Sequence, residues 1–324
     1  MKDDIILNFL RDQKENYISG EDISGRLKVT RSAVWKSIQH LRKLGYEIEA
    51  QPHLGYKLSS VPDKMFADEL SHGLQTKIIG KRIFSYDSLD STNDAALKLG
   101  EEGLPEGACV FAEHQKKGRG RLGREWVSPK SKNLIVSVLL RPALLPSEVS
   151  KMTLVAGVSA VRSIRKFTGQ TPGIKWPNDI VYKDKKIGGI LTELSAESDR
   201  VKFVVVGIGM NINSEARELP PGALSLAKIA GHKIARVEFA KEFLRIFDKD
   251  YQSFKTGDFA GLSKQWEEYS ATSGRRVAAS LFGRKIQGTA VGIDGDGALW
   301  IRRDDGLQER VLAGDIEHLT QDSK

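Results

Sequence analysis

The chain has 324 residues, of which 40% are hydrophobic, and this length is enough for two or three domains with sizeable cores. Its longest apolar runs, 133–140 and 203–210, are far shorter than the roughly 20 residues that span a bilayer, and its acidic start does not resemble a signal peptide, so we expect a cytoplasmic protein. The single cysteine, Cys109, excludes an intramolecular disulfide and a thiolate zinc site, whereas a net charge of +8 suggests an anionic partner.

Residues 1–63 are predicted to form three helices followed by a hairpin. Apolar residues recur at helical spacing near the N-terminus, and Ser19 and Thr30 are expected to cap a second and a third helix. The third helix is expected to end at Gly45, and residues 46–58 alternate like two strands around a turn. Three helices and a hairpin in this order are typical of a winged helix-turn-helix domain.

The third predicted helix is basic, and the sequence between positions 30 and 46 contains no acidic residue. In a winged helix the last helix enters the major groove, where side chains near its start meet base edges. We therefore expect Arg31, Ser32 and Lys36 to contact bases, and Lys36, Arg42 and Lys43 to contact phosphates. A three-helix protein-interaction module with a solvated basic face is the alternative, and the lack of acids favours DNA.

Residues 59–63 are polar and contain a proline, which favours a linker, and strand-like and helical runs then alternate over 64–270. This alternation indicates a sheet backed by helices. Over 271–324, short alternating runs are separated by glycine turns typical of hairpins, so a small β-barrel is expected. The predicted domains are therefore 1–63, 64–270 and 271–324. In the central domain the expected strands are 108–113, 134–140, 180–182, 189–194 and 202–208, and the expected long helices are 147–168 and 237–254.

Three adjacent hydrogen-bonding residues, Ser91, Thr92 and Asn93, follow a strand-like run and precede an apolar one. One of them is expected to cap a helix. Together they could also pair the polar head group of a small molecule, because a buried ureido or amide group must be fully hydrogen-bonded.

Between residues 118 and 124 three glycines alternate with three arginines, a composition that leaves little to pack in a core. This segment is predicted to be a loop. Glycines let the backbone approach a ligand, and arginines offer planar pairs of donors that match phosphate or carboxylate oxygens, so an anionic ligand is expected. A nucleic-acid-binding tail rich in Arg-Gly-Gly is the alternative, but such tails lie in disordered sequence and this loop lies between two strand-like segments.

Residues 175–179 read Lys-Trp-Pro-Asn-Asp and place a lysine, an amide and a carboxylate beside a proline-restricted turn. Lysine suits a phosphate, while Asp179 could hold a metal ion or orient an attacking amine. An ordinary turn around a buried Trp176 explains the segment equally well. Lys186 follows in a turn that enters a strand and can point at the same ligand. The Gly-x-Gly at 207–209 does not support a dinucleotide fingerprint, which needs a third glycine.

Together these clusters resemble the biotin protein ligases. The resemblance rests on Ser91-Thr92-Asn93, on Gln115 with the loop at 118–124, and on the segments 175–179 and 186–191. Because a winged helix precedes the core and a small β domain follows it, the whole chain resembles the bifunctional type that is also the biotin operon repressor. The resemblance implies an α+β fold, with a central mixed-sheet catalytic core like that of class II synthetases and an SH3-like C-terminal domain.

The resemblance implies a ligase that forms biotinyl adenylate from biotin and ATP, with magnesium, and releases pyrophosphate. A lysine on a biotin carrier domain, of the acetyl-CoA carboxylase type, then takes the biotinyl group. It also implies a repressor of biotin synthesis genes, which binds operator DNA as a homodimer promoted by the adenylate. No enzyme nucleophile is needed, which agrees with a lone cysteine and a site rich in cations.

The resemblance also assigns residues to these roles. Biotin is expected at Ser91, Thr92, Asn93, Gln115, Gly118, Arg119, Gly120, Arg121, Lys186 and Gly188. The nucleotide is expected at Arg119, Arg121, Lys175, Asn178 and Asn211. The expected catalytic residues are Arg119, Arg121, Lys175, Asp179 and Lys186, with Lys175 stabilising developing charge and Asp179 positioning or deprotonating the incoming lysine. No metal site made by the protein alone is expected. A transcription factor whose core only senses a ligand, and a lipoate ligase on the same scaffold, are the two rival functions.

Overall fold

The computed structural model describes residues 2–13, 16–197, 200–281, 284–312 and 314–319. The chain divides into two compact units, Met1–Lys64 and Met65–Lys324. Within the described ranges, every helix is too short or too polar to cross a bilayer. The limits given above for three domains remain predictions.

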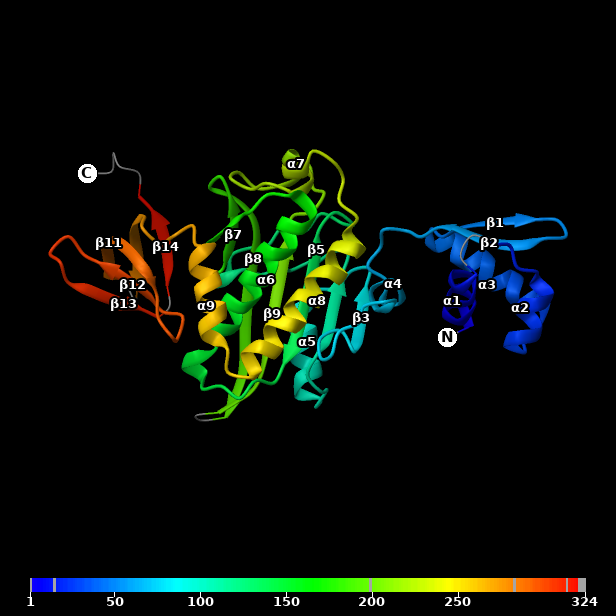
Figure 1. The fold of residues 1–324 in the computed structure, drawn as a ribbon, viewed down its shortest axis with the longest axis horizontal. Helices are drawn as coiled ribbons and strands as arrows, with labels where there is room; N and C mark the ends of the chain where they lie inside the picture. Colours follow the sequence, from blue (N-terminus) through cyan, green and yellow to red (C-terminus); the bar gives the residue numbers. More distant parts are fainter. Residues whose placement is uncertain (1, 14–15, 198–199, 282–283, 313, 320–324) are drawn as a thin grey trace. The chain divides into compact units, whose positions relative to one another are not determined.

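The first unit is a winged helix-turn-helix domain, as predicted, and is blue in Figure 1. Its elements are α1 (Lys2–Asp12), α2 (Gly20–Leu27), α3 (Arg31–Leu44), β1 (Glu47–Gln51) and β2 (Gly55–Ser60), with the two strands paired antiparallel. The predicted caps are confirmed, since Ser19 and Thr30 each accept a hydrogen bond from a backbone N–H of the following turn. Gly45 ends α3 with φ at 106°, a left-handed conformation that favours glycine. The helices bury a small core that includes Ile6, Ile23, Val34, Ile38 and Leu41.

The second unit is built on a seven-stranded mixed sheet with the order β3-β4-β5-β9-β8-β7-β6. Strands β3 and β4 are parallel, and all other neighbours in this order are antiparallel. All residues of β5 are buried, because helices cover both faces of the sheet there. The strands are β3 (Arg82–Tyr86), β4 (Ala108–Ala112), β5 (Leu134–Leu140), β6 (Gly173–Lys175), β7 (Asp179–Tyr182), β8 (Lys185–Glu197) and β9 (Arg200–Met210).

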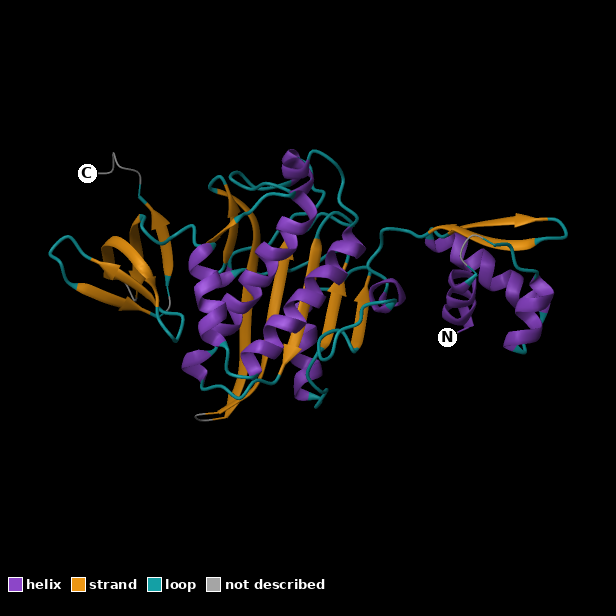
Figure 2. Cartoon of the chain, viewed as in Figure 1, coloured by secondary structure: helices purple, strands orange, loops and turns teal. Residues whose placement is uncertain are grey.

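Helices α6 (Ser150–Thr168) and α8 (Arg236–Lys255) lie side by side on one face of this sheet (Figure 2). The main core fills the space between them and alternate residues of β5 and β9. Helix α5 (Thr92–Glu101) packs on the opposite face, where its Ala96 joins a separate cluster with Leu139 and Phe203. The shorter helices are α4 (Ala67–Ser71), α7 (Leu226–Ala230) and α9 (Phe259–Glu268).

The C-terminal part of the second unit is a five-stranded antiparallel sheet with the order β13-β12-β11-β10-β14. A small β domain is therefore confirmed, and among the residues described its edge strands β13 and β14 do not pair with each other. A hydrogen bond of 3.1 Å from Trp176 Nε1 to Gly297 O ties this sheet to the central one. The strands are β10 (Arg276–Leu281), β11 (Arg284–Ile293), β12 (Leu299–Arg302), β13 (Gln308–Val311) and β14 (Asp315–His318).

Candidate functional site

A cavity of about 390 Å³ lies over β5, β8 and β9, next to the first turn of α5. Its wall joins segments that are far apart in the sequence, including the start of α5, the arginine/glycine loop and strand β14. The predicted residues in this wall are Ser91, Thr92, Asn93, Gln115, Arg119, Gly120, Arg121, Lys175, Asn178, Asp179 and Lys186. Three other predicted residues, Gly118, Gly188 and Asn211, are not part of the wall.

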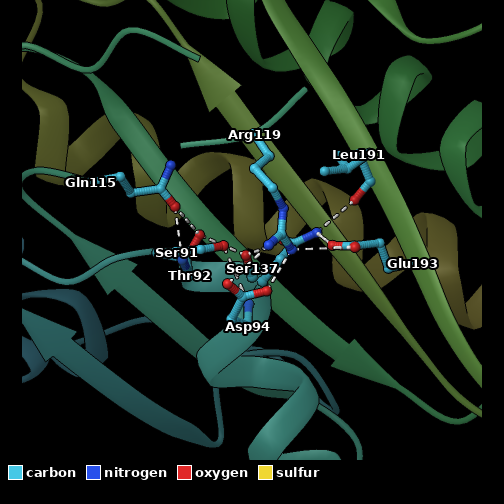
Figure 3. Close-up of polar contacts among 9 residues, drawn as sticks. Ser91, Thr92, Asp94, Gln115, Arg119, Ser137, Leu191 and Glu193 are labelled. Carbon is cyan, nitrogen blue, oxygen red and sulfur yellow. Dashed lines mark hydrogen bonds and ion pairs between the residues drawn. The ribbon is translucent and has the colours of Figure 1, made fainter. Parts of the chain in front are cut away.

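A network of hydrogen-bonded polar side chains, drawn in Figure 3, includes several residues that line the cavity. The Thr92 backbone N–H and hydroxyl both donate to Gln115 Oε1, at 2.7 and 2.9 Å. The Ser137 hydroxyl on β5 donates to Asn93 Oδ1 at 2.5 Å and lies 2.7 Å from Thr92 Oγ1. The Asn93 amide donates in turn to Glu193 Oε2 at 2.6 Å. Such a network holds the polar groups that face the cavity in fixed directions.

Ser91 has the capping role that the sequence left open. Its hydroxyl accepts a hydrogen bond of 3.3 Å from Asp94 N and begins α5. The residue is buried and also lines the cavity, so capping and ligand contact are compatible at this position.

Two glycines of β9 let bulky side chains approach the sheet. A Cβ atom on Gly207 would lie 2.1 Å from Asn93 Oδ1, and one on Gly209 would lie 2.5 Å from the Trp126 ring. Real side chains do not approach this closely, so glycine is required at both positions. The Gly-x-Gly pattern therefore positions Asn93 and Trp126 around the cavity.

The first arginine of the loop is held by carboxylates in this structure. Arg119 donates to the two oxygens of Asp94, at 3.1 and 2.5 Å, and lies 3.4 Å from Glu193 Oε1 (Figure 3). The hydrogen bonds to Asp94 raise the pKa of Arg119 above its usual value. Arg119 therefore links the loop to α5 and β8.

The second arginine of the loop, Arg121, has a hydrogen-bond donor that no described residue accepts. The side chain of Arg121 is 23% exposed, and its Nη1 is buried and has no hydrogen-bond partner among the residues described. The nearest carboxylate, Asp315 on β14, is 3.8 Å from Nη1 and also pairs with Arg124. Burial lowers the pKa of Arg121, and the negative charges of Asp315 and Asp179 oppose that shift. A buried cationic donor without a partner suits an anionic ligand.

Residues 175–179 line the cavity and are held in place by contacts with other segments. Trp176 is buried, as the turn interpretation predicted, and its backbone N–H donates to Thr272 Oγ1 at 3.0 Å. The peptide bond between Trp176 and Pro177 is cis. Asn178 uses its amide nitrogen to bind Ile190 O at 2.8 Å.

Lys186 and Asp179 form an ion pair of 2.7 Å in the cavity wall. The Lys186 ammonium also lies 5.8 Å from the centre of the Trp126 ring, which is within the range of a cation–π contact. The lysine predicted in a turn is thus brought to the same place as the segment 175–179.

Asn211, predicted to bind the nucleotide, and Arg42, predicted to bind DNA, both make contacts within the protein. The Asn211 amide lies 3.4 Å from Leu224 O and is not part of the cavity wall, so its contact with the nucleotide stays a prediction. In the first unit, the Arg42 guanidinium donates to Ile48 O at 2.9 and 2.5 Å and ties α3 to β1. The phosphate contact of Arg42 stays a prediction, and Arg31, Ser32 and Lys36 are exposed on α3.

Sequence reasoning missed several residues at the site. Trp126, which lines the cavity two residues after the loop, could have been noticed as an aromatic residue beside an arginine cluster. Asp94, Ser137 and Asp315 gave no local signal, because their roles depend on contacts between distant segments.

Comparisons with known proteins agree with this geometry. The model of the Biotin/lipoate A/B protein ligase family matches residues 85–211, the HTH domain model matches 5–57, and the Biotin protein ligase C terminal domain model matches 272–319. The first of these matches spans the start of α5, the arginine/glycine loop, the segment 175–179 and Lys186.

Relatives extend over almost the whole chain. The bifunctional ligase/repressor BirA of Bacillus subtilis is 38% identical over 93% of this chain and 94% of its own length. The protein of the same name from Escherichia coli is 30% identical over 92% of each. Among solved structures, a biotin protein ligase from Aquifex aeolicus in complex with biotin and ATP has a TM-score of 0.63 and 30% identity, covering 74% of this chain and 100% of that one.

Proposed function

This chain belongs to the family of bifunctional biotin ligase/repressors, and we propose that the cavity described above is where it activates biotin with ATP. One observation carries the assignment: the hydrogen-bonding cluster, the arginine/glycine loop, the segment 175–179 and Lys186 all line a single cavity. Cationic side chains and hydrogen-bonding side chains both line it. This combination suits a ligand with a neutral polar ring and an anionic end.

Biotin is proposed to place its ureido group against the polar network. Ser91, Thr92, Asn93 and Gln115 would hold this group, and their own hydrogen bonds keep their orientation fixed. Lys186 would attract the biotin carboxylate. Gly118, Gly120 and Gly188 would contribute backbone, although only Gly120 of the three lines the cavity.

For the first chemical step, we propose that the biotin carboxylate oxygen attacks the α-phosphorus of ATP and pyrophosphate leaves. Charge accumulates on the phosphoryl oxygens, and fixed cations stabilise that charge. Arg121 has a buried, unused donor for this purpose, and Lys175 and Arg119 lie in the same wall. Asn178 would contact the nucleotide.

Magnesium is proposed to accompany ATP. This ion is usually bound through one or two carboxylates together with substrate phosphates, so it does not require a dedicated cluster of protein ligands. Groups of three His, Cys, Asp or Glu side chains placed to hold a metal are absent from the described residues, which is compatible with such a shared site.

For the second step, we propose that a lysine amine of a biotin carrier domain attacks the acyl carbon of biotinyl adenylate and AMP leaves. The amine must be neutral to attack, so a base has to receive a proton. Asp179 is proposed to orient this amine and accept the proton, which requires its ion pair with Lys186 to rearrange.

We propose that the winged helix binds operator DNA of biotin synthesis genes and that two copies of the chain bind together, promoted by the adenylate. One recognition helix makes few contacts, and a dimer supplies two. The arginine/glycine loop supports a link between ligand and dimer, because its Leu122 is 77% exposed and directly follows Arg121, which is proposed to bind the ligand. The cytoplasmic location stays a prediction.

The ligase assignment is tested by incubating the protein with labelled biotin, ATP and an apo biotin carrier domain. Covalent label on the carrier lysine, dependent on ATP, is the expected result. Incorporation of lipoate in place of biotin would favour the lipoate ligase, and no incorporation of either would favour a ligand-sensing transcription factor.

A further inference from the structure

Trp35 lies exposed on α3 and is not part of the buried core of the head, which is the winged helix-turn-helix unit Met1–Lys64. Its side chain is 54% exposed, whereas Val34, Ile38 and Leu41 of the same helix are buried. The other four tryptophans of the chain are buried or half-buried. A single exposed apolar residue is normal on a protein surface. Whether Trp35 has a function therefore depends on the residues around it.

The surroundings of Trp35 are those of a DNA-reading surface. Residues three and four apart on a helix share a face, so Arg31 and Ser32 precede Trp35 on its face and Gln39 follows. Helix α3 contains no acidic residue. In helix-turn-helix proteins the first turns of this helix meet base edges, which places Trp35 among the expected base contacts.

The hairpin does not offer a comparable surface. Its strand β1 carries Glu47 and Glu49, both exposed, and these charges oppose close approach of phosphates. Lys36 and Lys43 on α3 are exposed and supply the opposite charge. The charge distribution of the head therefore favours α3 as the element that meets DNA.

The chemistry of the indole side chain limits which base groups Trp35 can recognise. It has one N–H donor and is otherwise apolar. Base edges in the major groove present donors and acceptors, and the one apolar group among them is the C5-methyl group of thymine. We propose that Trp35 is a specificity residue of the head that recognises a thymine methyl group in each half-site. This inference rests on the DNA binding proposed above.

The test uses the full chain with biotin and ATP, and a duplex that the same protein selects from random-sequence DNA. Each thymine of a half-site is replaced in turn by deoxyuridine, which removes only the methyl group. At one position this replacement is expected to weaken binding by the parent protein about fourfold, the effect of one buried methyl group. Trp35→Ala should bind the thymine and deoxyuridine duplexes equally, and Trp35→Phe should retain part of the difference.

Matched variants separate the possible outcomes. Ile5→Ala removes a side chain that is 49% exposed on α1 and should keep the parent's preference for thymine. Lys43→Ala removes an exposed lysine expected to contact phosphates and should weaken binding to all duplexes alike. Thermal unfolding that matches the parent shows that Trp35→Ala is folded.

The inference is wrong if Trp35→Ala still prefers thymine wherever the parent does, or if no thymine methyl matters to the parent. Binding of DNA by the head would stand in both cases. Failure of the parent to select any duplex would overturn the proposed DNA binding together with the inference.

Discussion

At the scale of single residues, Arg119 and Arg121, two of the three loop arginines that line the cavity, have different partners. Arg119 is engaged by Asp94 and Glu193, whereas Arg121 keeps a buried donor without a partner among the described residues. A ligand must displace carboxylates to use Arg119, but it gains Arg121 directly. Retention of the adenylate should therefore depend more on Arg121.

Arg121→Ala is expected to release the adenylate roughly 10- to 100-fold faster, because a hydrogen bond to a charged group contributes about 1.5–3 kcal/mol. Arg119→Ser should act in the same direction with a smaller factor. The measurement is the rate at which labelled adenylate leaves the isolated complex. Unchanged retention in both variants would refute the idea that the loop clamps the intermediate.

Lys186→Ala should raise the concentration of biotin required for half-maximal adenylation at least tenfold, since it removes a charge next to the proposed carboxylate position. Lys185→Ala is the matched control, because Lys185 is its exposed neighbour on β8. Lys175→Ala should instead slow the adenylation step. If Lys186→Ala had the parent's biotin dependence, Lys186 would be an ordinary residue of the turn.

At the scale of elements, local signals predicted α3 and β5 well, because a cap, a terminating glycine and a continuous apolar run are properties of neighbouring residues. Contacts between distant segments gave no such signal. Asp315 pairs with Arg124, which is 191 residues earlier in the chain. Arg42 also donates to Ile48 O of β1, and the sequence did not predict this contact because it depends on how the hairpin folds back. The three-residue strand β6 is too short to show a periodicity.

Strand β14 contributes to the cavity wall, and His318 lies at its end. Its ring lies 3.2 Å from Arg275 Nη1 and 3.4 Å from Thr272 Oγ1. Burial, together with the charges of Lys175 and Arg275, lowers the pKa of His318 from 6.5 to about 4. The unfolded chain therefore takes up this proton at a higher pH than the folded chain does.

Stability should consequently fall as the pH drops from about 6.5 towards 4, by on the order of 1 kcal/mol for His318 after screening by solvent. His318→Gln should reduce this dependence, which is measured as the free energy of unfolding in urea at pH 7 and pH 5. The control is His72→Gln, since His72 is exposed. The same pH dependence in His318→Gln and the parent would contradict this role.

At the scale of the whole molecule, biotinyl adenylate is proposed to link the ligase and DNA-binding activities. If the adenylate promotes the dimer that binds DNA, then operator DNA must by linkage also favour the adenylate-bound chain. A carrier domain that discharges the adenylate should release DNA. The arginine/glycine loop is expected to connect ligand binding with dimer formation, because it carries Arg121 in the cavity wall and the exposed Leu122 beside it.

The most direct test is a titration of operator DNA with the full chain, in the presence and in the absence of biotin and ATP. Binding is expected to be at least tenfold tighter with both ligands, and Arg121→Ala should lose most of this difference because it does not retain the adenylate. Equal DNA affinity of the parent protein with and without biotin and ATP would contradict the account.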